Sequence, residues 1–169
     1  MEWMTMPLKR YAEFSGRSRR KEYWMWTLFI LLAYVAFFIV LMALGGSAYM
    51  GMISGSSSGL GAAGGAALII VGLFFIFLLA ILIPALAVTV RRLHDTNRSG
   101  WWMLLPLAAY PIQIIGAVTQ SSALALVGSL VGLGLGILLL VWYCTDGTPG
   151  PNGYGPDPKV RDGMESLAY

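Results

Sequence analysis

The amino-acid sequence predicts an all-α integral membrane protein with four transmembrane helices and both termini in the cytoplasm. Of its 169 residues, 57% are hydrophobic and 11% are charged. No Asp, Glu, Lys or Arg occurs from Tyr23 to Val90 or from Ser99 to Thr145. The charges therefore fall in three short segments, residues 2–22, 91–98 and 146–165. A soluble domain of this size exposes many charged side chains, whereas long uncharged apolar runs are typical of membrane spans.

Four stretches within the uncharged runs have the length and composition of membrane-spanning helices. We predict them at residues 24–44, 66–90, 101–118 and 123–143 of a single membrane domain, residues 1–169. The first is long enough to cross the hydrocarbon layer, since its residues extend it by about 31 Å at ~1.5 Å each. The segment Gly45–Gly65 is rich in Gly, Ser and Ala and is predicted to be a flexible loop.

The basic residues predict the orientation of these helices. They lie in an N-terminal surface segment (residues 1–23), in a loop between the second and third helices (91–100) and in a Pro/Gly-rich tail (144–169). The two other connections, residues 45–65 and 119–122, contain no Lys or Arg. Since cytoplasmic loops carry the excess of basic residues, all three charged segments are predicted to be cytoplasmic.

The composition also excludes several kinds of protein. One cysteine, Cys144, cannot form an internal disulfide, and one Cys with one His falls short of the four ligands that a structural zinc site typically needs. We predict no metal and no cofactor. No Asp, Glu, Lys, Arg or His falls within a predicted span, which argues against an ion-coupled transporter. Positive charge beside a membrane favours anionic lipid as a partner and gives no indication of nucleic-acid binding.

The charged loop between the second and third helices is the first candidate site. It begins Arg91-Arg92-Leu93-His94-Asp95. Arginine presents a planar fork suited to phosphate oxygens, and Asp95 could orient His94 as an acid or base. No nucleophile accompanies them, so no catalytic residue is predicted. The alternative is a tight turn whose arginines only set the topology.

The N-terminal segment is the second candidate. Three arginines precede an aromatic pair, Tyr23 and Trp24, at the start of the first helix. Basic residues next to a membrane attract anionic lipid, and aromatic residues anchor at the headgroup level, although the same charges also serve topology alone. The combined lipid- or phosphate-binding candidates are Arg17, Arg19, Arg20, Arg91, Arg92, His94, Asp95 and Arg98, and the interfacial anchors are Tyr23, Trp24, Trp101 and Trp102.

The fourth predicted helix has small residues at four-residue spacing, namely Gly128, Gly132 and Gly136. In lipid, small residues at this spacing let two helix backbones approach closely. The sequence leaves open whether the partner helix belongs to the same chain or to a second copy in a homo-oligomer.

The tail from Asp146 to Pro158 is dense in turn-forming residues. Its Pro, Asn and Tyr content favours an ordered loop that folds back against the basic segments, where Asp146 and Asp157 would pair with arginines. The alternative is a flexible Pro-rich tail.

Three motifs together carry a family resemblance. They are the segment Phe14–Trp24, the pair of stretches Arg91–Asp95 and Ser99–Trp102, and the tail segment Gly150–Pro158. The chain resembles the domain of unknown function 805 family, the YhaH-like small bacterial inner-membrane proteins, from about Phe14 to Pro158. The resemblance implies a multi-pass protein of the bacterial inner membrane with no established activity. It implies no catalytic residue and favours the motifs forming one cytoplasmic assembly.

These observations favour a non-enzymatic module that binds anionic lipid or a protein partner through a cytoplasmic Arg/Trp face. Two alternatives remain: an enzyme that acts on a lipid headgroup or phosphate through His94 and Asp95, and an oligomeric pore or carrier assembled through the glycine face.

Overall fold

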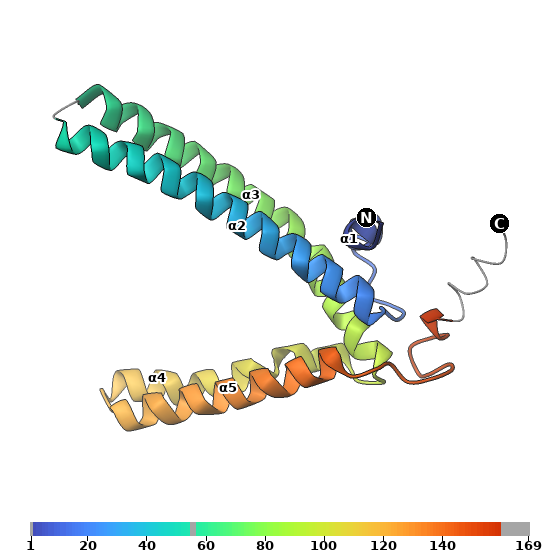
Figure 1. The fold of residues 1–169 in the computed structure, drawn as a ribbon. Coiled ribbons are helices and arrows are strands. Elements are labelled where there is room, and N and C mark those ends of the chain that lie inside the picture. Colours follow the sequence, from blue (N-terminus) through green and yellow to red (C-terminus); the bar gives the residue numbers. More distant parts are fainter. Residues whose placement is uncertain (1, 55–56, 160–169) are drawn as a thin grey trace. The chain divides into compact units, whose positions relative to one another are not determined.

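The computed structural model describes residues 2–54 and 57–159, which are mostly helical with no β-strand among them. Figure 1 shows the helices, which are α1 (Glu2–Lys9), α2 (Arg20–Ile53), α3 (Ser57–Asp95), the 3₁₀ helix η1 (Gly100–Ala109), α4 (Tyr110–Val118) and α5 (Ser122–Cys144). Within the described residues, four segments are long and apolar enough to cross a membrane: Arg20–Ala43, Leu68–Asp95, Gly100–Val118 and Ser122–Cys144. The predicted fold class, an all-α membrane protein with four spans, is therefore confirmed, while the orientation of the termini stays a prediction.

The prediction of a flexible loop at Gly45–Gly65 is wrong for most of that segment. Helix α2 continues to Ile53 and α3 already begins at Ser57, while residues 55–56 lie outside the described residues. The composition of this segment resembles that of a soluble linker, but it contains no charged residue. The apolar spans end at Ala43 and resume at Leu68, so this segment lies beyond them, and nothing in its composition explains why both helices continue into it.

The described residues form two compact units, of which the first contains residues 2–11 and 24–85. In this unit α2 and α3 pack as an antiparallel hairpin (Figure 1). The rings of Phe37 and Phe74 stack between the two helices, with centroids 3.6 Å apart and an interplanar angle of 5°. Tyr34 meets the same Phe74 edge-on at 5.5 Å. These offset and edge contacts are the arrangements that aromatic pairs prefer.

A proline in α3 explains one further contact of this unit. Pro84 has no N–H group, so the carbonyl of Ala80, four residues earlier, lacks its usual helical donor. The hydroxyl of Tyr11 donates to that carbonyl at 2.5 Å. Tyr11 thus supplies a hydrogen bond that the helix itself cannot make, and it ties the segment after α1 to α3.

The second unit contains residues 12–23 and 86–159. Its span Gly100–Val118 begins as the 3₁₀ helix η1 and becomes α-helical at α4. Pro106 lies inside η1, where it removes one backbone donor and disfavours α-helical geometry at the preceding residue, whereas Pro111 lies in the first turn of α4, where proline is tolerated. Pro106 is therefore the residue in the predicted helix 101–118 that favours the 3₁₀ segment.

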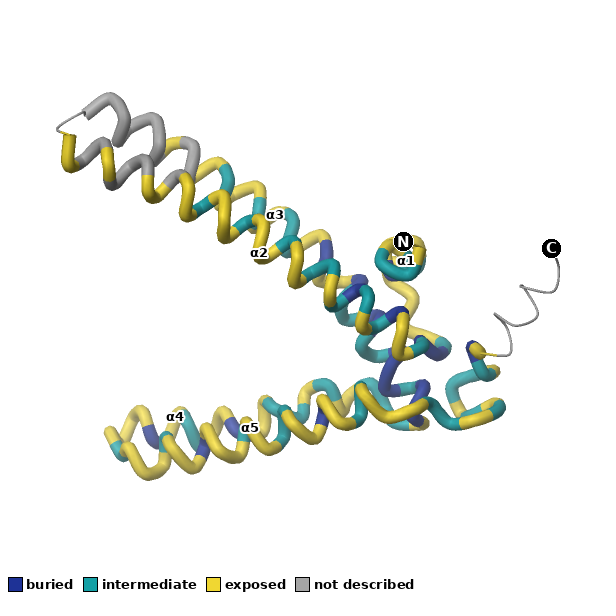
Figure 2. The backbone as a smooth tube through the Cα atoms, viewed as in Figure 1, coloured by how far each residue is buried: buried dark blue, intermediate teal, exposed yellow. Residues whose placement is uncertain are grey.

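Helix α5 packs directly on α4, and glycines permit the approach. A Cβ atom at Gly116 of α4 would lie 2.6 Å from the backbone nitrogen of Ala125 in α5. In Figure 2 the remaining surfaces of α4 and α5 are mostly exposed, as expected of helices whose outer faces contact lipid. The core of this unit lies instead at the C-terminal end of α3, where Val88, Leu93 and several charged side chains are buried.

Candidate functional site

The C-terminal end of α3 is covered by the tail that follows α5. The last carbonyls of a helix have no partner within the helix and need donors from elsewhere. The backbone N–H of Thr148 donates to the carbonyl of Asp95 at 2.9 Å. The side-chain amide of Asn152 donates to the carbonyl of His94, also at 2.9 Å. The tail is thus an ordered cap on α3, as the density of turn-forming residues predicted.

Arg17 joins the N-terminal segment to this cap. Its Nε donates to the Asp95 carboxylate at 3.0 Å, and its two terminal nitrogens donate to the carbonyls of Gly150 at 2.6 Å and Thr148 at 2.5 Å. The Arg17 side chain is only 1% exposed. All three nitrogens of one buried guanidinium therefore connect segments that are about 80 and 130 residues apart in sequence.

Arg92 connects the end of α5 to α3. It donates to the second oxygen of Asp95 at 2.6 Å, to the carbonyl of Tyr143 at 3.1 Å and to the carbonyl of Thr145. The latter two carbonyls belong to the end of α5, where cations are favourable because the helix dipole is negative. Arg92 thus caps one helix while its own helix is capped by the tail.

Arg91 fixes the start of α2 against α3. It pairs with Glu22 at 2.9 Å, and both side chains are at most 3% exposed. A second nitrogen donates to the carbonyl of Glu13 at 2.8 Å, and the N–H of Ser18 donates to the carbonyl of Arg91 at 3.1 Å. We call the resulting assembly, residues 13–22, 91–97 and 145–158, the clasp. The three motifs of the sequence meet in it.

Two glycines allow the clasp to close. A Cβ atom at Gly147 would lie 2.1 Å from Oδ2 of Asp95, so no larger residue fits where the tail crosses the end of α3. Gly16 has a φ of 83°, in the left-handed region that glycine adopts without strain, and its carbonyl lies 3.2 Å from Nδ1 of His94. Both glycines therefore satisfy a geometric requirement of the clasp.

His94 and Asp95 do not act as a pair in this arrangement. Both carboxylate oxygens of Asp95 contact arginines, whereas Nδ1 of His94 faces a backbone carbonyl. The imidazole stacks on the ring of Tyr154 with centroids 3.9 Å apart and an interplanar angle of 6°. The geometry gives His94 a packing role against the tail. It provides no support for His94 as an acid or base oriented by Asp95.

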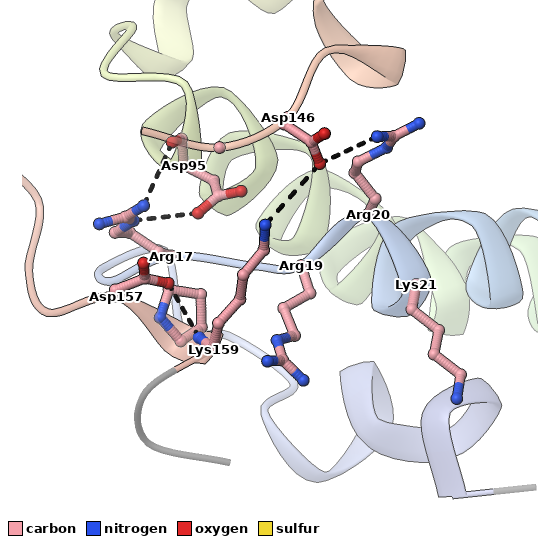
Figure 3. A pocket seen from close by; sticks show the side chains of 10 residues that line it. Arg17, Arg19, Arg20, Lys21, Asp95, Asp146, Asp157 and Lys159 are labelled. Atoms are coloured by element: carbon pink, nitrogen blue, oxygen red, sulfur yellow. Dashed lines mark hydrogen bonds and ion pairs between the residues drawn. The ribbon is translucent and has the colours of Figure 1, made fainter. Parts of the chain in front are cut away.

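A basic pocket of 230 Å³ opens at the clasp, which supplies all of its lining residues except Lys159 (Figure 3). Gly147, Pro158 and eight charged side chains line the pocket. The basic ones are Arg17, Arg19, Arg20, Lys21 and Lys159, and the acidic ones are Asp95, Asp146 and Asp157. Arg20 donates to Asp146 at 2.9 Å, and the Lys159 ammonium lies 3.8 Å from the same oxygen. The tail therefore contributes both a cation and carboxylates to a surface that is otherwise made by the N-terminal segment.

Two carboxylates of this pocket have lowered pKa values. A hydrogen bond from Arg20, and then its charge, lower the pKa of Asp146. The backbone N–H groups of Lys159 and Gly150, at 2.9 and 3.2 Å, lower the pKa of Asp157. We predicted that both aspartates would pair with arginines. Asp146 does pair with an arginine, whereas Asp157 accepts hydrogen bonds chiefly from the backbone of the tail.

A second pocket of 440 Å³ is lined mainly by apolar side chains. His94 and Ser99 are its polar margin, and its other lining residues are Phe14, Leu86, Val90, Gly100, Trp101, Met103 and Leu104. Across the described residues, no group of three or more His, Cys, Asp or Glu side chains has the placement of a metal site.

The predicted aromatic anchors differ in exposure. Trp101 is 80% exposed and Trp24 is also exposed, as expected of residues that meet lipid headgroups. Tyr23 instead packs on Tyr143 with ring centroids 4.8 Å apart. Trp102 lies edge-on against Trp142 at 5.7 Å, although it is also partly exposed.

Arg98, the remaining basic candidate, lies outside the basic pocket. Its guanidinium carbon lies 4.5 Å from the ring centroid of Trp142, a cation–π contact. A terminal nitrogen donates to the carbonyl of Thr96 at 3.3 Å. The clasp therefore contains seven of the eight predicted candidates, all except Arg98. Of these seven, Arg17, Arg19, Arg20 and Asp95 also line the basic pocket.

The glycine face of α5 is used within the chain over most of its length. A Cβ atom at Gly128 would lie 2.7 Å from Cγ of Gln113 in α4, and one at Gly132 would lie 3.3 Å from Cβ of Ala109. Nothing lies within 4 Å of such an atom at Gly136. The sequence left open whether this face packs against the same chain or against a second copy. Gly128 and Gly132 pack against the same chain.

Several important residues were not singled out from the sequence. Glu22 forms an ion pair with Arg91, Gly147 allows the tail to pass close to Asp95, and Thr148 caps α3. Each is a common residue type without a distinctive local sequence pattern. Asn152 had a better signal, because an Asn among prolines and glycines is typical of a structured turn. It accepts from the N–H of Tyr154 at 2.9 Å in such a turn.

Comparison with known proteins places this geometry in a family. Inner membrane protein YhaI of Escherichia coli (strain K12) is 36% identical over 159 residues, which cover 94% of this chain and 97% of that protein. Inner membrane protein YhaH of the same strain is 35% identical over 161 residues, covering 95% and 99%. Uncharacterized protein YiiR is 28% identical over 151 residues, or 86% of each chain. No solved structure matches.

The two inner-membrane relatives agree with the four apolar helices, which fit a multi-pass protein of that membrane. The family model described as "Protein of unknown function (DUF805)" matches residues 11–156, a range that contains the whole clasp except its last two residues. The chain belongs to the DUF805 family.

Proposed function

We propose that this protein is a non-enzymatic module of the bacterial inner membrane that binds anionic lipid through the basic pocket, on the cytoplasmic side. The observation that carries the proposal is the lining of the pocket, in which five basic side chains face three carboxylates. Each basic residue close to an anionic membrane surface contributes about 1 kcal/mol of attraction. The cytoplasmic placement follows from the distribution of Lys and Arg along the sequence.

The contacts divide the arginines into two groups with different roles. Arg17, Arg91 and Arg92 are buried and donate to carboxylates and carbonyls within the clasp. Arg20 and Lys21 are exposed, and they line the pocket with the half-buried Arg19 and the exposed Lys159. The first group therefore builds the site, and the second supplies the charge that a lipid headgroup would meet.

The clasp gives the pocket a defined shape. Lys159 directly follows the tail segment Asp146–Pro158, which is fixed to α3 by Arg17 and Asn152. A flexible tail would present its cations only as a diffuse charge, whereas this tail brings a cation opposite those of the N-terminal segment. This arrangement supports a site with a preference among anions, in addition to general attraction to the membrane.

The test is native mass spectrometry of the full-length protein released gently from its own membrane. Arg20→Gln removes one pocket cation, and Lys9→Gln is the matched control because it removes one exposed cation from α1, outside the pocket lining. We expect anionic lipid to remain bound to the wild type and to Lys9→Gln, and to be reduced in Arg20→Gln. Equal retention by both variants would contradict a lipid site in this pocket. Retention of a protein subunit in place of lipid would favour the protein-partner alternative.

A further inference from the structure

One carboxylate occupies the position where an anionic ligand would be held. Asp146 lies between Arg20, at 2.9 Å, and Lys159, at 3.8 Å, and both cations approach the same oxygen (Figure 3). The three side chains are 68%, 46% and 58% exposed, respectively. Ion pairs as exposed as these contribute little to stability and exchange readily with other ions. The contact is therefore poorly explained as a structural support.

The neighbouring ion pairs show the contrast. Asp95 is at most 5% exposed and is held by Arg17 and Arg92. Those contacts are permanent features of the clasp because breaking them would leave buried charges. Asp146 follows α5 directly, on the first residues of the tail, and nothing comparable holds its carboxylate.

The charge of the pocket indicates what would replace this carboxylate. Five basic against three acidic lining residues leave two positive charges in excess. A phosphate monoester has a second pKa of about 6, so that it carries close to two negative charges at neutral pH, whereas a phosphate diester carries one. Phosphate oxygens also form the same charge-assisted hydrogen bonds with Arg that a carboxylate forms.

We infer that the basic pocket binds a dianionic phosphate group, and that Asp146 holds the position of one phosphate oxygen until the ligand displaces it. The inference rests on the proposed function for the anionic nature of the ligand, and it adds the class of the headgroup and the residue that competes with it. Arg20 and Lys159 would exchange one carboxylate oxygen for phosphate oxygens, without any change in the buried ion pairs of Asp95. The phosphate could come from a lipid headgroup or from a free phosphate.

Asp146→Asn is the variant that separates competition from structure. It retains the shape of the side chain but removes its charge. Competition predicts several-fold tighter binding of a phosphate monoester, whereas a structural role predicts weaker binding together with a less stable tail. Glu2→Gln is the matched control, because it removes one exposed carboxylate from α1. Unchanged thermal unfolding of both variants would establish that they fold normally.

The experiment uses the full chain in nanodiscs of zwitterionic phosphatidylcholine. One arm adds phosphatidate, a lipid monoester, a second adds phosphatidylglycerol, a lipid diester, and a third titrates inorganic phosphate into discs without anionic lipid. We expect phosphatidate or inorganic phosphate to bind more tightly than phosphatidylglycerol, and Asp146→Asn to tighten that binding while Glu2→Gln does not. Whether the phosphatidate arm or the inorganic phosphate arm responds identifies the source of the phosphate.

The other outcomes overturn the inference, and they do so distinguishably. Equal binding of both lipids that depends on Arg20 would retain the proposed function but reject the dianionic class. Preference for the monoester with unchanged or weaker binding in Asp146→Asn would reject displacement of Asp146. Binding of no anion in any arm would reject both the inference and the proposed function.

Discussion

Substituting Asp95 by Asn should destabilise the protein more than any other single change of charge that we consider. Asp95 accepts from Arg17 at 3.0 Å and from Arg92 at 2.6 Å, and the three side chains are at most 5% exposed. The asparagine retains the shape but leaves two buried guanidinium groups without a counter-charge. Removing one partner of a buried ion pair costs about 3–5 kcal/mol. Hydrogen bonds to charged groups contribute about 1.5–3 kcal/mol each, so two such bonds give about 3–6 kcal/mol, which overlaps that range.

The assay is equilibrium unfolding of the full chain in mild detergent. A loss of about 3–5 kcal/mol is a large share of the stability of a typical protein, about 5–15 kcal/mol, so the midpoint should fall markedly. Asp146→Asn is the control, because its exposed ion pair should leave the midpoint nearly unchanged. A midpoint for Asp95→Asn equal to that of Asp146→Asn would refute the interpretation of the clasp as a buried charge network. A double-mutant cycle with Arg17→Gln should show non-additivity, since the two residues share one contact.

Three further predictions concern the tail. Gly147→Ala should release the tail, because the added Cβ would lie 2.1 Å from a carboxylate oxygen. Gly134→Ala is the control and should be tolerated, because nothing lies within 4 Å of its added Cβ. Limited proteolysis of the tail would distinguish the two variants, and equal resistance to the protease would contradict this geometry. Asp157, whose pKa is lowered in the folded state, should contribute stability above its ordinary pKa and lose it as the pH falls through the lowered value. Asp157→Asn should abolish that acid-induced change, measured by the NMR signals of Tyr154. His94→Ala should loosen the tail, whereas His94→Phe should keep the tail in place because it retains a ring that can stack on Tyr154. If both variants lost the function of the protein in the cell at normal protein levels, the enzymatic alternative would be favoured.

The membrane spans could be predicted from the sequence because a single property, the absence of charge over a sufficient length, determines them. The predicted fourth span, residues 123–143, differs from α5 by one residue at each end. The segment Gly45–Gly65 could not be interpreted in the same way, because it lies outside the long apolar runs and its Gly and Ser residues favour loops. Its composition therefore gave no indication that α2 and α3 continue into it.

The candidate site was predictable in its parts but not in its contacts. The sequence showed three motifs rich in Arg, Asp, Pro and Gly, and it favoured an ordered tail against the basic segments. It could not show that Arg91 and Arg92 are buried while Arg20 is exposed, since adjacent arginines look alike until their partners are known. Those partners, such as Glu22 and the carbonyl of Tyr143, lie about 50 to 70 residues away along the chain.

The most direct test of the clasp, on which the shape of the pocket depends, is amide hydrogen exchange of the full chain in lipid nanodiscs. Thr148 and Ser18 belong to different segments of the clasp, and each donates its N–H to a carbonyl near the end of α3, at 2.9 and 3.1 Å. We predict that both amides are protected in the wild type and that Arg17→Gln exposes both of them together. Exchange of the Thr148 amide at the rate of an unstructured chain in the wild type would contradict the clasp and the pocket built on it.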